Sequence, residues 1–329
     1  MHFVNEIGLH INEILRGETA AVTLPVKMIK NLLFHLKLNM MIKQVFVLLI
    51  SFFLGIYSST AGSAILSVET RGQGHPMILI HGMSCSADVW DEVATYYEDR
   101  YELHLVTIAG FGNHQSVEAS HVLKAIRDAL LEYVKAESLN RPVLMGHSMG
   151  GFLSLWAAVE APDVFGRIIS VDGLPYFPVL SQPGITPETA GPIVEMIQNN
   201  IKNATPEMAR FSQEMMIASM IGDPEKRPAV VEMGMNSNTD VIARAMGEMY
   251  TTDIRQEVKA VDVPVLAFGS WYGYRQWGVT KESASAAYRA QFDAMPNATF
   301  KMAETALHFI FYDEPEWFFK VVDGFLAER

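Results

Sequence analysis

The sequence predicts an α/β protein: a mostly parallel sheet with flanking helices and one inserted helical region. Of its 329 residues, 50% are hydrophobic and 19% are charged, a composition that buries a large core and differs from that of disordered or coiled-coil chains. From residue 65 onward, short β-rich apolar runs alternate with segments of helical periodicity, as expected for strand–helix–strand units. The alternation is interrupted once, over residues 176–263.

Seven short apolar runs are expected to form the strands, because polar residues, Gly or Pro bound them. Five segments with apolar residues at helical spacing are expected to form the flanking helices. The expected strands are 65–70, 76–81, 103–108, 142–146, 167–171, 264–269 and 299–303, and the expected helices are 87–99, 120–138, 149–161, 281–294 and 314–328.

The interrupting segment, 176–263, has helical spacing throughout and carries many methionines. We expect it to form a helical cap inserted into a core made of 65–175 and 264–329. A methionine stripe on such a helix is either ordinary core or a pliable apolar wall over a binding cleft. If the cap covers the strand ends, a small-molecule substrate enters between the cap and the sheet.

The amino-terminal region has the three parts of a secretory signal peptide. Lys43 precedes the apolar run VFVLLISFFLGIY, residues 45–57, and small residues follow it. We predict a signal peptide over 40–64 and a periplasmic or secreted protein, with no stable membrane insertion after cleavage. The alternative is a membrane anchor through 45–57. Residues 1–39 are an uncertain leader, because they are unusual before such a segment and can reflect a start codon placed too early.

Charge and cysteine content exclude several classes of function. With 25 Lys and Arg against 37 Asp and Glu, the net charge of -12 repels phosphate backbones, so no nucleic-acid partner is expected. The single cysteine, Cys85, cannot form an intramolecular disulfide and is expected to be a small packing residue. Histidines are dispersed and no phosphate-binding loop follows the first strands, so we expect no metal and no cofactor. The sequence does not indicate an oligomeric state.

The most informative segment is RPVLMGHSMGGFLSLWAAVEAP, residues 141–162. An apolar strand pattern there runs directly into a G-x-S-x-G sequence, Gly146 to Gly150, and a helical pattern follows. So sharp a turn forces Ser148 into a strained conformation, and glycine on both sides removes the collisions. The hydroxyl is thereby held out at the carboxyl end of the sheet, near the positive end of the helix dipole. We predict that Ser148 is a nucleophile.

This segment, with PMILIHGMS at 76–84 and TIAGFGNHQS at 107–116, resembles the α/β-hydrolase family. The resemblance covers about residues 64–329 and implies that family's fold. GHSMGG, VDGLP and the late HFIFYDEPEWF segment are typical of an exported group within it. The segment at 107–116 resembles a Gly-x-Gly-x-x-Ser turn of that family, which would be only a structural loop.

The resemblance also implies an oxyanion hole, which needs N–H donors aimed at the charge that develops during acyl transfer. The donors would be the backbone N–H groups of Met83, in the loop after His81, and of Met149, directly after the nucleophile. Their side chains can be apolar, because main-chain groups donate.

A serine hydroxyl needs a neighbouring base, and histidine titrates in the right range. His308 follows the last expected strand, where the family's base is found; the alternative is an ordinary loop histidine. His147 adjoins Ser148, but neighbours on such a turn point apart, so we expect it to pack beneath the turn. His81 is expected to anchor the oxyanion loop.

The position of the acid departs from the commonest family pattern. The strand at 264–269 leads into GSWYGYRQWG, 269–278, which has no Asp or Glu. Asp172 ends the strand after the serine turn, where some relatives, including haloalkane dehalogenases, carry their acid, and the chain order Ser148, Asp172, His308 is kept. We favour Asp172 as the orienting acid. Alternatively, it caps a backbone turn, and a dyad is assisted by water or a carbonyl.

These residues together predict a serine hydrolase that cleaves a small to medium apolar carboxylic ester, or a lactone or thioester, through an acyl-enzyme. Aromatic residues at the cap entrance and in the segment without an acid are expected to bind substrate: Tyr176, Phe177, Trp271 and Tyr272. The alternatives are a non-catalytic ligand-binding relative, and a cofactor-free perhydrolase or carbon–carbon bond hydrolase on the same residues.

Overall fold

The computed structural model describes residues 65–116 and 118–328. The predicted leader, 1–39, and the predicted signal peptide or anchor, 40–64, lie outside these residues, so export and membrane anchoring stay predictions. None of the helices in the described part of the chain has the length and apolarity needed to cross a membrane.

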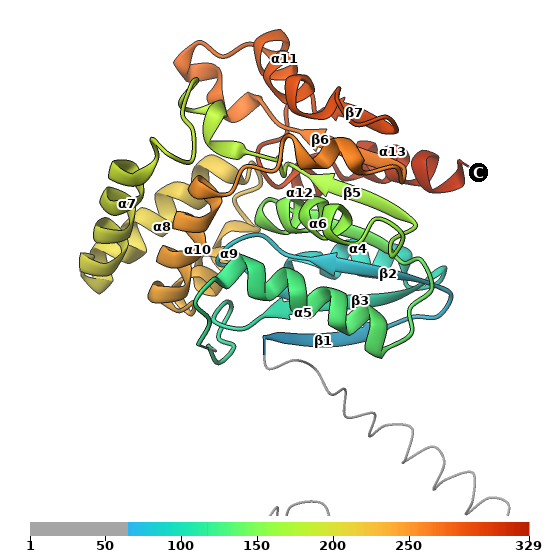
Figure 1. Ribbon diagram of the computed structural model, residues 1–329. Helices are drawn as coiled ribbons and strands as arrows, with labels where there is room; N and C mark the ends of the chain where they lie inside the picture. The colour runs from blue at the N-terminus through green and yellow to red at the C-terminus, as the bar shows by residue number, and fades with distance from the viewer. Residues whose placement is uncertain (1–64, 117, 329) are drawn as a thin grey trace, which may run out of the picture. The chain divides into compact units, whose positions relative to one another are not determined.

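A seven-stranded sheet forms the centre of the described chain (Figure 1). Its order is β1-β3-β2-β4-β5-β6-β7; β1 pairs antiparallel with β3, and the other neighbouring pairs are parallel. Each expected strand forms within two residues of its predicted bounds. The strands are β1 (Leu66–Arg71), β2 (His75–Ile80), β3 (Tyr101–Ile108), β4 (Val143–His147), β5 (Arg167–Val171), β6 (Val265–Gly269) and β7 (Ala298–Met302).

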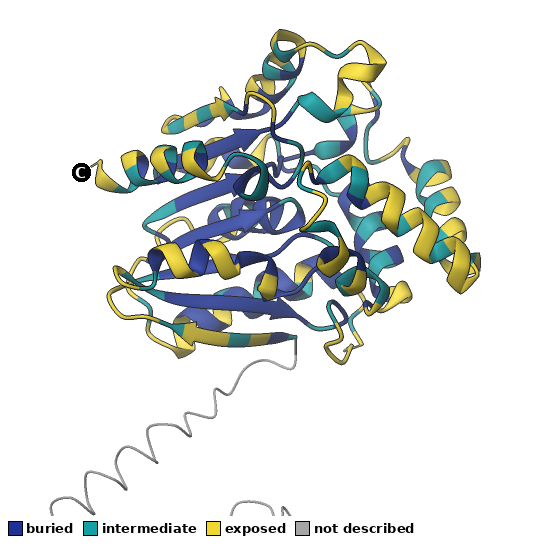
Figure 2. Ribbon diagram, turned by 180° about the vertical axis from the view of Figure 1, so that it is seen from behind, coloured by how far each residue is buried: buried dark blue, intermediate teal, exposed yellow. Residues whose placement is uncertain are grey.

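Helices cover both faces of this sheet, and the central strands are buried between them (Figure 2). In β2, Ile78 and Ile80 belong to the core on one face, while Met77 and Leu79 belong to the core on the other. Continuous apolar strands of this kind are typical of parallel sheets. The first face is covered by α5 (Val122–Ala136), α6 (Met149–Glu160) and α11 (Lys281–Phe292), and the second by η1 (Ala87–Trp90), α4 (Asp91–Tyr97), α12 (Ile310–Asp313) and α13 (Pro315–Ala327).

Residues 176–263 are inserted between β5 and β6 and contain helices but no strand, which confirms the inserted helical region of the predicted fold. Its longer helices gather beyond one end of the sheet (Figure 1). Within it, α7 contacts α10 and α8 contacts α9. The inserted elements are η2 (Phe177–Leu180), α7 (Gly191–Asn203), α8 (Pro206–Met220), α9 (Arg227–Met235), α10 (Thr239–Thr251) and η3 (Glu257–Ala260).

The insertion, hereafter the cap, is attached to the loop that follows β3, and therefore lies at the carboxyl ends of the parallel strands. The Asn238 N–H, at the start of α10, donates to the carbonyl of Gly110 over 2.7 Å. The Glu248 carboxylate of α10 accepts the N–H groups of Val122 and Leu123 over 2.6 and 2.8 Å. A carboxylate at a helix N-terminus satisfies otherwise unpaired donors, so Glu248 stabilises α5 and ties α10 to the core.

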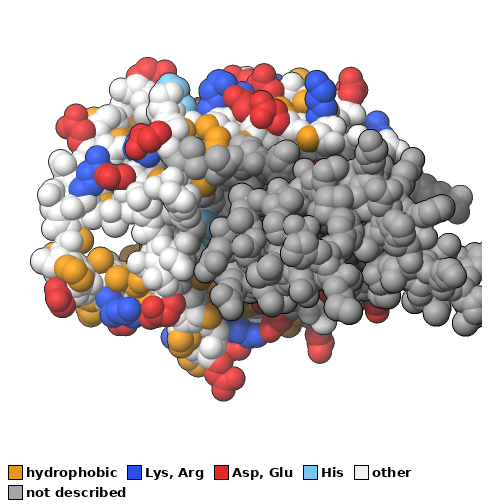
Figure 3. Space-filling model, turned by 90° about the horizontal axis from the view of Figure 1, so that it is seen from below, with side chains coloured by type: hydrophobic (Ala, Val, Ile, Leu, Met, Phe, Trp, Pro, Cys, Tyr) orange, Lys and Arg blue, Asp and Glu red, His pale blue; other side chains and the backbone are white. Residues whose placement is uncertain are grey.

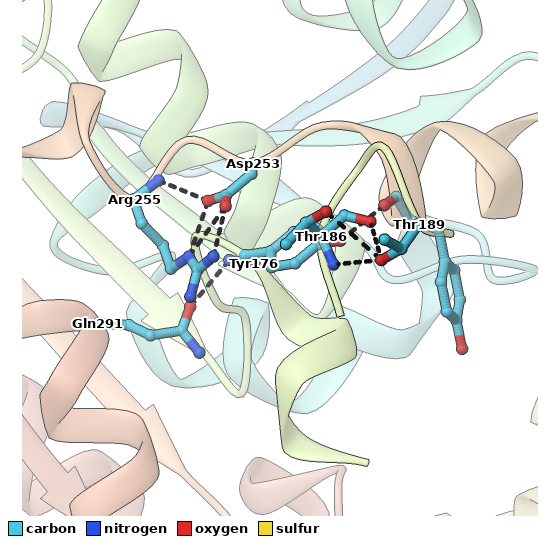
Figure 4. A network of polar contacts seen from close by, with 7 residues as sticks. Tyr176, Thr186, Thr189, Asp253, Arg255 and Gln291 are labelled. Carbon is cyan, nitrogen blue, oxygen red and sulfur yellow. Dashed lines mark hydrogen bonds and ion pairs between the residues drawn. The ribbon is translucent and has the colours of Figure 1, made fainter. Parts of the chain in front are cut away.

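Polar contacts also fix the two chain crossings between core and cap (Figure 4). The backbone N–H of Tyr176 donates to Gln291 of α11 over 2.9 Å, which holds the outgoing chain. The returning chain carries a paired Asp253 and Arg255, and the Arg255 guanidinium lies 4.9 Å from the centre of the Tyr176 ring. The crossings are therefore held side by side.

On the face seen from below Figure 1, acidic and basic side chains are interspersed on the described part of the surface (Figure 3).

Several apolar side chains of the cap are exposed. On α8, Met208, Phe211 and Met215 are exposed to 59%, 65% and 59%. These methionines face outward and are not part of the core.

Candidate active site

The strand–turn–helix at Ser148 has the strained geometry that its sequence predicts. Ser148 has φ 56° and ψ −118°, between the end of β4 and the start of α6. A Cβ on Gly146 would lie 2.0 Å from the carbonyl oxygen of Gly150, so a side chain there is incompatible with the turn. The Ser148 N–H donates to the carbonyl of Val171 over 2.8 Å, which places the serine beside the residue that follows β5.

That residue is Asp172, and the structure brings it together with His308. Nδ1 of His308 lies 2.6 Å from Oδ2 of Asp172, across 136 residues of sequence. The Asp172 side chain is 2% exposed and that of His308 is 20% exposed. Because the carboxylate accepts, Nδ1 donates, and Nε2 of the neutral imidazole carries the free lone pair. This tautomer suits a base that receives a proton at Nε2.

The remaining acceptor sites of Asp172 are also used. The Ser270 N–H and hydroxyl donate to it over 2.8 and 2.7 Å, and the Tyr288 hydroxyl donates over 2.7 Å. Burial and the neighbouring Asp172 charge raise the pKa of Tyr288 well above its ordinary value, so the phenol stays protonated. Ser270 directly follows β6, where the commonest family pattern has an acid. The serine there helps to hold the acid that ends β5.

His308 itself lies on the loop between β7 and α12. Two carboxylates accept hydrogen bonds from the backbone of that loop. Glu314 accepts the N–H groups of Thr305 and Ala306, the latter over 2.8 Å. Asp313 accepts the N–H of Leu307 over 2.8 Å. The backbone on the amino-terminal side of the histidine is therefore fixed by charge-assisted hydrogen bonds.

The same loop is connected to the cap. Asp313 also accepts the Gly222 N–H over 2.8 Å, at the end of α8, and burial raises the pKa of its carboxyl. The Phe309 N–H donates to the carbonyl of Met220 over 3.2 Å. These contacts join the C-terminal end of α8 to the histidine loop, so the position of His308 depends partly on the cap.

The residues predicted to form an oxyanion hole lie on neighbouring segments. Met149 is the first residue of α6, so its N–H has no acceptor within the helix. A Cβ on Gly82 would lie 3.2 Å from Cβ of Ser148, which shows that the loop carrying Met83 lies directly against the serine turn. Met149 is buried and Met83 is half-buried. The placement is compatible with the predicted donors, whose role stays a proposal.

His81 and Cys85 are buried near this loop. Nε2 of His81 accepts the Ile108 N–H over 3.1 Å, and Nδ1 donates to the Gly82 carbonyl over 2.6 Å. Burial lowers the pKa of His81 to about 4, so the ring is neutral and joins the end of β2 to the end of β3. Burial raises the pKa of the Cys85 thiol to about 12, which disfavours the nucleophilic thiolate.

The aromatic residues expected to bind substrate have different surroundings. Tyr176 is fully buried and its hydroxyl donates to the Tyr250 carbonyl over 2.9 Å, so its side chain offers no accessible surface to a substrate. Phe177 is half-buried and packs edge-on against Tyr250. The expected loop at 269–278 contains a short helix, η4 (Tyr272–Trp277). Trp271 and Tyr272 are half-buried at its start.

Sequence reasoning missed Ser270 and Tyr288. Ser270 could have been found by asking what replaces the acid after β6, whereas Tyr288 has no local signature beyond its place on the buried face of α11. The described residues hold no cluster of three or more His, Cys, Asp or Glu side chains able to bind a metal ion, and the absence of metals and cofactors stays a prediction.

The fold and this geometry define the class of protein. Residues 77–321 match the model of the alpha/beta hydrolase family, and the chain belongs to that family. It is an α/β hydrolase, and its sequence is distantly similar to those of methyl ester esterases.

Two sets of relatives bear this out. The chain is 25% identical over 261 residues to the pimeloyl-[acyl-carrier protein] methyl ester esterase of Serratia marcescens, covering 79% of this chain and 97% of the relative. Among solved structures, an esterase from Thermogutta terrifontis matches with a TM-score of 0.64 and 21% identity over 82% of this chain and 95% of its own. The enol-lactonase of Burkholderia xenovorans LB400 matches with a TM-score of 0.66 and 15% identity over 81% and 99%. The two structural likenesses show the fold.

Proposed function

We propose that this protein is a serine hydrolase that cleaves a small to medium apolar carboxylic ester, or a related lactone or thioester, through an acyl-enzyme. The observation that carries the proposal is the Asp172–His308 hydrogen bond of 2.6 Å, beside a serine in a strained strand–turn–helix. A buried carboxylate that orients an imidazole to act on a serine hydroxyl is the arrangement that activates such a nucleophile.

In the proposed reaction, the Ser148 oxygen attacks the ester carbonyl while Nε2 of His308 takes its proton. Asp172 holds the imidazole in the Nδ1–H tautomer and stabilises the imidazolium that forms. The N–H groups of Met83 and Met149 donate hydrogen bonds to the carbonyl oxygen and so stabilise the negative charge that develops on it. His308 then protonates the leaving alcohol, and a water molecule, deprotonated by the same imidazole, releases the acid from Ser148.

The apolar substrate class rests on the side chains next to the serine turn and at the cap. The half-buried side chains of this set offer mainly apolar surface, as is common in pockets for small molecules: Met83, Phe177, Trp271 and Tyr272. The esterase activity in the names of the curated relatives supports the same bond type. The preferred length of the acyl chain is measured with a series of esters.

The test treats the full-length protein with a fluorophosphonate probe and assays p-nitrophenyl esters of increasing chain length, with a lactone and a thioester in the same panel. Ser148→Ala is compared with Ser219→Ala, because Ser219 is an exposed serine on α8. We expect labelling of the wild type and Ser219→Ala, none of Ser148→Ala, and a loss of ~10⁴-fold or more in the kcat of Ser148→Ala. Equal labelling of Ser148→Ala would overturn the proposal.

A further inference from the structure

His147 is a buried histidine that the proposed reaction does not use, although it adjoins the nucleophile. It is 1% exposed. Its ring centre lies 4.5 Å from that of His308 and 4.4 Å from that of Phe309. The edge-to-face rings of Trp90 and Phe311 complete the surroundings, at 6.4 and 5.3 Å. The side chain therefore packs directly against the loop that carries the proposed base.

A hydrogen bond defines how His147 meets that loop. Nε2 of His147 lies 3.1 Å from the backbone carbonyl oxygen of His308, across 161 residues of sequence. A carbonyl only accepts, so Nε2 carries the hydrogen and the ring is the neutral Nε2–H tautomer. Nδ1 is buried without a hydrogen-bond partner in the described chain and faces the turn after β2, where a Cβ on Gly82 would lie 2.9 Å from it.

This ring is also kept uncharged. Burial, and then the facing imidazole of His308, lower the pKa of His147 well below its ordinary value. A second positive charge against the proposed base would oppose the imidazolium that must form during acyl transfer. A neutral donor can instead hold the loop without this repulsion.

We propose that His147 is a positioning residue: it fixes the His308 loop to the serine turn through its N–H to the His308 carbonyl and its ring contact. The inference rests on the proposed function. Ser148 is attached covalently to His147, so the two contacts tie nucleophile and base together through one residue. Small misplacements of reacting groups can cost about 10²-fold in rate, so this tie acts on turnover.

Three substitutions separate positioning from simple packing. His147→Gln places an amide N–H about as far from Cα as Nε2 and can keep the donor. His147→Asn ends about where Nδ1 lies and cannot reach the carbonyl. His147→Phe keeps an aromatic ring among Trp90, Phe309 and Phe311 but has no donor. Because Gln and Asn are both polar amides, their comparison remains informative if the Phe variant does not fold.

The experiment measures kcat and KM on the best ester of the panel, the rate of fluorophosphonate labelling, and the thermal midpoint of each full-length variant. We expect Asn and Phe to lower kcat and the labelling rate about 10- to 100-fold with KM within twofold, and Gln to recover most of the loss. The inference is overturned if Asn and Phe keep wild-type kcat, if Gln is as impaired as Asn, or if the losses in kcat follow the thermal midpoint alone. Failure of the positioning role can be told apart from failure of the proposed function. If the protein is not a serine hydrolase, the probe does not label the wild type at Ser148.

Discussion

The nucleophile and the base of the proposed site are positioned by different physical means. Ser148 is placed by excluded volume: the chain passes from β4 to α6 so tightly that a Cβ on Gly146 would lie 2.0 Å from a backbone oxygen. His308 is placed by hydrogen bonds, from Nδ1 to Asp172 and from its carbonyl to His147, on a loop that Asp313 and Glu314 hold.

Substitutions at the two residues are therefore expected to have different effects. A close-packed backbone turn cannot accommodate an added side chain, so a substitution there affects folding itself. A hydrogen-bonded arrangement can lose one partner while the chain still folds, so changing it affects orientation and turnover. We therefore expect substitutions of the glycines in the Ser148 turn to lower stability, and substitutions of the residues that hold His308 to lower kcat.

The strongest test of the steric half is Gly146→Ala. The added Cβ meets the backbone at 2.0 Å, so we expect a loss of about 4 kcal/mol or more in the free energy of unfolding, measured by urea denaturation, or failure to fold. The matched control is Gly324→Ala, in an exposed part of α13 with nothing within 4 Å, which should be neutral or stabilising by up to about 1 kcal/mol. A Gly146→Ala variant as stable as the wild type would contradict the steric account.

On the base side, Asp172→Asn should leave the fold intact and remove most activity. The four groups that contact Asp172 donate to it, and the amide substitutes a donor for one acceptor, so His308 is driven toward the wrong tautomer. We expect kcat to fall about 10³- to 10⁴-fold. Asp323→Asn is the control, because Asp323 also accepts from a tyrosine hydroxyl, that of Tyr96, but away from the site. Near-normal turnover of Asp172→Asn would assign the orienting role elsewhere.

The same contrast explains what could be predicted from the sequence. The strand–turn–helix is a local feature, so the glycines around Ser148 predicted its geometry. The contact of Asp172 with His308 was predicted from the resemblance to the α/β-hydrolase family, because the chain order fits that family and 269–278 contains no acid. The donors from Ser270 and Tyr288 were not, because they depend on how the end of β6 and α11 pack around a carboxylate.

The cap residues show the limit of composition as a guide. The position of an aromatic residue at the entrance of the cap does not determine which way its ring points. Tyr176 was expected to bind substrate, and it instead lies fully buried with its hydroxyl bonded to the Tyr250 carbonyl. The ring directions depend on the packing of the two chain crossings, which the local sequence does not contain.

The mildest test of the comparison is Tyr288→Phe, which removes one donor from Asp172 and leaves the His308 contact in place. We expect kcat to fall about 3- to 10-fold with KM unchanged, because the carboxylate loses one of the contacts that hold its orientation. Tyr133→Phe is the control: its buried hydroxyl contacts His104 over 2.7 Å away from the site, so it should cost a similar ~1 kcal/mol of stability without lowering kcat. If both variants lose stability and neither loses turnover, Tyr288 serves the fold alone, and the orientation of the Asp172 carboxylate depends on Ser270 and His308.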